Sequence, residues 1–129
     1  MSLLRLLPDL VWLVPALPLL ALAVTGLRVL LGRAQGDAGE PPTARLCTLA
    51  AFGSLAILLG IDLGAALAGA PGHRVLGTWF ASGDWQGTVS FLLDPLALTV
   101  ATLAALIGWL AMRFSANYLH REAGFHRFF

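Results

Sequence analysis

Three long apolar segments run through the sequence, and polar stretches separate them. The clearest segment covers residues 95–112, which carry no charged side chain and lie between Asp94 and Arg113. At 1.5 Å of rise per helical residue this run is about 27 Å long, close to the roughly 30 Å hydrocarbon core of a bilayer. With flanking residues included, the pattern predicts membrane spans over about 10–31, 46–70 and 92–114.

The two connecting segments have different compositions. Residues 32–45 contain Gly, Asp, Glu and a proline pair, which predicts a solvated loop. Residues 71–91 are rich in glycine, aromatic and β-branched residues, and the turn-forming residues Ala81-Ser82-Gly83-Asp84 lie in the middle, so they predict a β-hairpin. An interfacial belt of Trp79, Phe80 and Trp85 is a second, compatible interpretation.

The distribution of arginine predicts the orientation, because Lys and Arg near the ends of spans are retained in the cytoplasm. Two arginines, Arg5 and Arg74, fall on one side, whereas six fall on the other: Arg28, Arg33, Arg45, Arg113, Arg121 and Arg127. This majority places the 32–45 loop and a 115–129 tail in the cytoplasm, with the N-terminus and the 71–91 hairpin outside. The predicted fold for residues 1–129 is a single all-α membrane module of three transmembrane helices, with a short extracytoplasmic β-hairpin between the second and third.

The first apolar segment could instead be a secretory signal peptide. Arg5 precedes it, and Ala21-Leu22-Ala23 resembles a cleavage site. Against this, Asp9 lowers the charge of the leader, and the apolar run 10–27 exceeds the 7–15 residues typical of a signal core. We therefore expect a membrane span.

Composition supports lipid as the solvent. Hydrophobic residues make up 58% of the chain, charged residues only 12%, and mean hydropathy is +0.82, whereas soluble chains are about 45–50% apolar and about 25% charged. Net charge is +1 and all eight basic residues are arginine. Since no basic cluster is present, nucleic acid is not an expected partner.

Two carboxylates are candidates for a structural or ion-path role. Asp62 lies in the second apolar segment, where a charged side chain costs about 2.5–3.5 kcal/mol unless it is protonated, paired or hydrated. A modest shift of that span would instead put Asp62 near the outer headgroups. Asp94 precedes Pro95, which predicts the N-cap of the third helix.

The sequence predicts no catalytic, cofactor-binding or metal-binding residue. It contains no Gly-rich phosphate loop and no HExxH-like spacing, and Cys47 is the only cysteine. We expect Cys47 to be a small buried residue. His73, His120 and His126 fall in predicted loop or tail positions, where solvated imidazoles are expected.

Residues 75–129 resemble a known family. The motifs are Gly77-Thr78-Trp79, Gly83-Asp84, the string FLLDPLAL over 91–98, Tyr118, and the string REAGF with RFF, which includes Arg121, Glu122, Gly124 and Arg127. This region is similar to the N-terminal region of the antiporter-like large subunit, chain 5 or subunit L, of proton-pumping NADH:quinone oxidoreductase, respiratory complex I. The same region occurs in sodium/proton antiporters and in an energy-coupled inorganic-carbon uptake system.

The resemblance implies an inner (plasma) membrane protein with its C-terminus in the cytoplasm and other membrane subunits as partners. In that family the proton path uses a buried Glu and several Lys on later helices, whereas this chain contains no lysine. A further chain is therefore expected to carry the channel, the present sequence being a split or partial product. No NADH, FMN, iron–sulfur or quinone contact is expected here, because other subunits of the complex hold those groups.

Function is therefore expected to be structural, as a non-catalytic module of a proton-translocating, NADH:quinone oxidoreductase-like membrane arm. Alternatives are the corresponding part of a sodium/proton antiporter or inorganic-carbon uptake subunit, and a free-standing small membrane assembly protein. A channel-forming homo-oligomer that uses Asp62 would require this carboxylate to face a wet interior.

Overall fold

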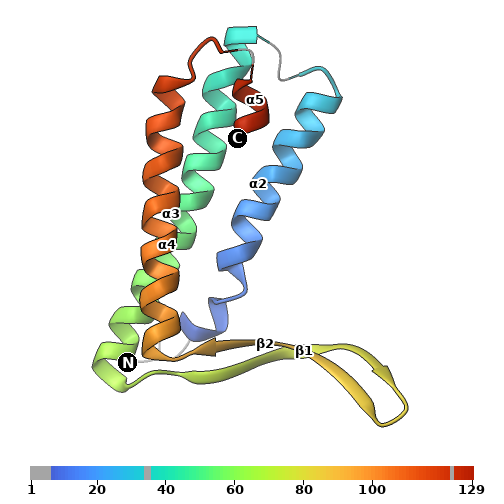
Figure 1. The fold of residues 1–129 in the computed structure, drawn as a ribbon, viewed down its shortest axis with the longest axis vertical. Coiled ribbons are helices and arrows are strands. Elements are labelled where there is room, and N and C mark those ends of the chain that lie inside the picture. Colours follow the sequence, from blue (N-terminus) through green and yellow to red (C-terminus); the bar gives the residue numbers. More distant parts are fainter. Residues whose placement is uncertain (1–6, 34–35, 123) are drawn as a thin grey trace.

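Three long helices stand side by side, and a two-stranded hairpin extends from one end of them (Figure 1). The structure is a computed structural model that describes residues 7–33, 36–122 and 124–129; Arg5 of the predicted leader lies outside this part. In chain order the elements are η1 (Leu7–Leu10), α2 (Leu13–Leu30), α3 (Gly36–Ala68), β1 (Gly72–Ser82), β2 (Trp85–Leu93), α4 (Pro95–Tyr118) and α5 (Phe125–Phe128). The predicted mostly helical fold is confirmed.

Three helical segments of the described chain are long and apolar enough to cross a membrane: Pro8–Leu30, Gly36–Ala68 and Pro95–Tyr118. The chain is a multi-pass membrane protein. Helix α3 is the central one, since it packs against both α2 and α4. Its 33 residues correspond to about 50 Å, which exceeds the hydrocarbon thickness, so α3 must tilt or extend beyond the apolar layer.

The predicted loop over 32–45 is wrong from Gly36 onward, because α3 begins there and includes Pro41 and Pro42. Proline removes a backbone donor and disfavours helix in the residue before it. Both prolines lie within the first two turns, so the loss is limited to hydrogen bonds near the helix start. Acidic Asp37 in the first turn is favourable at this end of the helix dipole.

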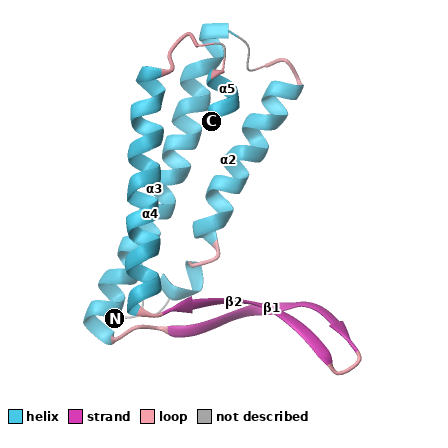
Figure 2. Ribbon diagram, viewed as in Figure 1, coloured by secondary structure: helices cyan, strands magenta, loops and turns pink. Residues whose placement is uncertain are grey.

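The predicted β-hairpin between the second and third long helices is confirmed. Strands β1 and β2 pair antiparallel from Gly72 opposite Leu93 to Ser82 opposite Trp85, with two irregularities in register. Gly83 occupies the turn with a positive φ of 59°, a backbone conformation that favours glycine. The hairpin runs across the end of the helices and projects beyond them (Figure 2).

Two buried clusters hold the bundle together, one at each end. At the hairpin end, the end of the bundle that carries β1 and β2, the buried residues are Val11, Ile61, Leu93 and Leu98. At the opposite, α5 end, they are Ala21, Ala44, Cys47, Phe125 and Phe129. The second cluster exists because α5 folds back between α2 and α3 (Figure 1). Burial of Cys47, which is 3% exposed, confirms its prediction as a small buried residue.

Replacing Phe125 by alanine should loosen α5 and uncover Cys47. Phe125 is 2% exposed and shares a cluster with Cys47, and truncating a buried phenylalanine costs about 3–5 kcal/mol. In mild detergent, we expect Cys47 to react with a small maleimide many times faster in the Phe125→Ala variant than in the unaltered chain. Phe114→Ala is the control, since Phe114 is 74% exposed. Equal protection of Cys47 in both variants would contradict this role of Phe125.

Candidate functional site

Asp62 contacts α4 through a short hydrogen bond in the hairpin half of the bundle. The hydroxyl group of Thr102 donates to Asp62 Oδ2 at 2.6 Å, and Asp62 is half-buried. Thr102 comes eight residues after Asp94, which caps α4, so it lies about 12 Å along this helix. The carboxylate therefore contacts the apolar part of α4, well away from the first turn of that helix.

The hydrogen bond from Thr102 affects how stable the Asp62 carboxylate is at this position. Burial in apolar surroundings is costly for an ionised carboxylate, and a donated hydrogen bond offsets part of the cost. Thr102 can therefore stabilise Asp62 and join α3 to α4. Among the described residues no group of three or more His, Cys, Asp or Glu side chains could hold a metal ion.

Asp94 is the N-cap of α4, as predicted. Its backbone is extended, with φ −85° and ψ 165°, and its Oδ1 accepts a hydrogen bond from the backbone N–H of Ala97 at 2.6 Å. Pro95 follows at the start of the helix, where its missing N–H would have no intrahelical partner anyway. Capping therefore accounts for both residues of the Asp-Pro pair.

Glu40 is buried, although it was not among the candidates predicted from the sequence. It is 5% exposed, and its two oxygens have different partners. Oε1 accepts from the backbone N–H of Arg121 at 3.0 Å, and Oε2 lies 2.7 Å from His120 Nδ1. The sequence placed Glu40 in a solvated loop. The available signal was a pair of acidic residues, Asp37 and Glu40, immediately before an apolar run, which is typical of a helix start.

Arg121 makes the turn between α4 and α5. It has a positive φ of 66°, which is uncommon for a non-glycine residue. Its backbone N–H is held by Glu40, and its Nε lies 3.3 Å from Asp37 Oδ2 in an exposed ion pair. Two contacts from α3 thus hold Arg121.

The other residues of the predicted cytoplasmic motif make no described side-chain contact with Glu40 or Asp37. Tyr118 ends α4 and is 86% exposed. Glu122 is exposed, Gly124 precedes α5, and Arg127 is exposed on α5. The motif therefore shapes the connection from α4 to α5, whereas Phe125 and Phe129 provide the buried contacts.

The histidines differ in their surroundings. His73 and His120 are exposed, as predicted. His126 is half-buried instead, and its Nδ1 lies 3.4 Å from the hydroxyl group of the fully buried Thr43. The reason is that α5 folds back onto α3. The sequence does not show which segment α5 packs against, so this burial could not be predicted.

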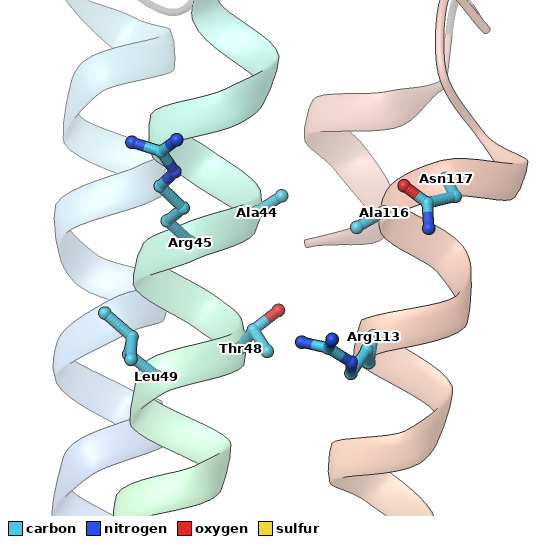
Figure 3. A pocket seen from close by; sticks show the side chains of 7 residues that line it. All are labelled: Ala44, Arg45, Thr48, Leu49, Arg113, Ala116 and Asn117. Carbon is cyan, nitrogen blue, oxygen red and sulfur yellow. The ribbon is translucent and has the colours of Figure 1, made fainter.

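A groove lies between α3 and α4 near the α5 end (Figure 3). It is open and has a volume of about 510 Å³. Thr48 and Arg113 point toward one another across it, and the short side chains of Ala44 and Ala116 leave space beside them (Figure 3). Arg45, Leu49 and Asn117 complete the lining.

Comparison with known proteins supports the resemblance deduced from the motifs. Residues 79–129 match the family model described as NADH-Ubiquinone oxidoreductase (complex I), chain 5 N-terminus. The chain is 28% identical over 94% of its length to NAD(P)H-quinone oxidoreductase subunit 5 of the Paulinella chromatophora chromatophore. It is 29% identical over 92% of its length to the chloroplastic subunit 5 of Angiopteris evecta.

The similarity covers most of this chain but little of each relative. The chain spans 18% of the Paulinella protein and 15% of the Angiopteris protein. The family match includes most of the hairpin, all of α4 and α5, and the Asp94 cap. The resemblance to the N-terminal region of the antiporter-like subunit is therefore confirmed.

Replacing Glu40 by alanine should release the turn at Arg121. The change removes the carboxylate that accepts from the Arg121 N–H and contacts the His120 ring, and a hydrogen bond to a charged group contributes about 1.5–3 kcal/mol. We expect trypsin to cleave after Arg121 several times faster in Glu40→Ala than in the unaltered chain, as measured by mass spectrometry of the fragments.

The matched control is Asp37→Ala. Asp37 also pairs with Arg121, but both side chains are more than half exposed, and such pairs contribute about 0–1 kcal/mol. Cleavage after Arg121 should therefore change little. If the two variants were cleaved equally fast, the buried carboxylate would not be what holds the turn.

Proposed function

We propose that this chain, a homologue of the N-terminal region of the antiporter-like chain 5 of complex I, is a membrane module of a proton-translocating, NADH:quinone oxidoreductase-like complex. The observation that carries the proposal is the family match over residues 79–129. Those residues include the end of β1, all of β2, the capped helix α4 and helix α5. The names of the relatives favour quinone reduction as the coupled process over sodium/proton exchange or inorganic-carbon uptake.

The role of the module is structural. Large apolar side chains are exposed on every long helix, among them Leu30 at 85%, Leu67 at 68% and Leu96 at 73%. In a membrane such faces contact lipid or other helices. Other membrane subunits of the complex are the partners, and one of them or a further part of the subunit carries the channel Glu and Lys.

We place the module in the inner (plasma) membrane with its N-terminus outside and its C-terminus in the cytoplasm. Six arginines support this orientation, because the helices and connections that carry them lie toward the α5 end (Figure 1): Arg28, Arg33, Arg45, Arg113, Arg121 and Arg127. Among the described arginines, Arg74 alone lies at the hairpin end, where it pairs with Asp9 at 3.6 Å. An excess of arginine on one side is typical of the cytoplasmic face.

The hairpin then lies at the outer surface, with Trp79 and Trp85 at 79% and 78% exposure. Tryptophan is enriched at the headgroup level of membranes, so these rings are suited to the interface beside the bundle. We assign no cofactor to this chain. NADH, FMN, iron–sulfur clusters and quinone belong to other subunits of the proposed complex.

Affinity purification of the tagged chain from native membranes in mild detergent tests the proposal. We expect mass spectrometry to identify a large multi-span chain together with NADH-oxidising or hydrogenase-like subunits. Recovery of antiporter or carbon-uptake subunits instead would change the coupled process. Recovery of the chain alone would contradict membership of a larger complex and favour a free-standing membrane protein.

Replacing Asp94 by leucine should weaken assembly and leave pumping per complex intact. Loss of an N-cap costs about 1 kcal/mol, and Asp94 has no other described side-chain contact that would give it a proton-transfer role. We expect less assembled complex in membrane vesicles, with proton pumping per assembled complex unchanged. Asp94→Asn should restore assembly, because asparagine caps helices equally well. Loss of pumping at full assembly would contradict a structural role for Asp94.

A further inference from the structure

We infer that the groove between α3 and α4 binds the headgroup of an anionic phospholipid. The groove is lined by two arginines, Arg45 and Arg113, together with the polar side chains of Thr48 and Asn117. Arginine guanidinium groups recognise phosphate through several parallel N–H donors, and hydroxyl and amide groups add further donors. Arg113 points across the groove toward Thr48, and Arg45 lies along α3 at its edge (Figure 3), so the lining suits a phosphate group.

Both arginines are available for such a ligand in the described part of the chain. The ion pairs found there involve Arg74, His120 and Arg121. Glu40 lines an adjoining cavity of about 380 Å³, which Arg45 also lines. Its two oxygens are already bonded to His120 and to the Arg121 N–H. No described carboxylate forms an ion pair with Arg45 or Arg113, so the groove presents positive charge.

The groove lies at the depth where lipid headgroups are expected. Arg45 immediately precedes the apolar residues 46–61 of α3, and Arg113 immediately follows the apolar residues 95–112 of α4. Both charges therefore mark the edge of the apolar layer at the same end of the bundle. Basic pockets between membrane helices on the cytoplasmic side are typical sites for anionic headgroups.

Apolar surface continues from the groove toward the membrane centre, which favours a lipid over a free anion. Leu49 is part of the lining. About one turn deeper, Phe52 of α3 packs against Trp109 of α4 with the rings tilted by 50° and their centroids 5.7 Å apart, and Phe52 is 49% exposed. An acyl chain attached to the bound phosphate would lie against these side chains, whereas inorganic phosphate would leave them uncovered.

The test uses the full chain in mild detergent, titrated with phosphatidylglycerol or phosphatidylcholine of identical acyl chains. Native mass spectrometry counts the bound lipids. We expect preferential binding of phosphatidylglycerol, and a loss of about 25-fold in its affinity in Arg45→Gln/Arg113→Gln, since each arginine near a membrane surface contributes about fivefold. Protection of Cys47 from maleimide verifies that the variant keeps its fold.

The matched control is Arg28→Gln/Arg33→Gln, which removes the same charge from the same end of the bundle outside the groove. It should keep most of the affinity. Three results would overturn the inference: equal losses in both double variants, equal binding of the two lipids by the unaltered chain, or inorganic phosphate that displaces phosphatidylglycerol at comparable concentration. The outcome does not depend on which process the complex couples.

Discussion

The burial of one carboxylate, that of Glu40, organises the α5 end of the bundle. A buried acid is stable only when its oxygens are hydrogen-bonded, and the partners of Glu40 come from the turn after α4. This requirement brings the start of α3 and the end of α4 together. It also directs the chain back into the bundle, so that Phe125 and Phe129 cover Cys47 and Ala44.

The two ends of the module are built from different interactions. At the hairpin end, Asp94 caps α4 and Asp62 accepts a hydrogen bond from Thr102. An apolar cluster there joins Val11, just after η1, to the hairpin, α3 and α4. At the α5 end, Arg45 and Arg113 line an open groove, and Arg45 also lines the cavity beside the buried Glu40. This asymmetry agrees with a fixed orientation in the membrane, since positive charge is tolerated mainly on the cytoplasmic side.

Local chemistry is what made parts of the fold predictable. Asp94 and Pro95 form a cap from adjacent residues, and the hairpin turn at Gly83 needs only a short stretch of sequence. Pro41 and Pro42 misled for the same reason. Their local preference is for a loop. The helix is favoured instead by contacts with distant residues, because Glu40 bonds to the Arg121 N–H and the buried Thr43 lies against His126.

By itself the sequence determined the three apolar spans, the hairpin between the second and third, the Asp94 cap and the resemblance to a chain 5 N-terminal region. Each of these features depends on neighbouring residues or on a continuous motif. Only the tertiary structure decided which polar groups meet. Thr102 with Asp62 and Arg121 with Glu40 are 40 and 81 residues apart. Such pairs form only once the helices pack, since a buried or half-buried carboxylate must be hydrogen-bonded and the donors of both pairs lie on distant parts of the chain.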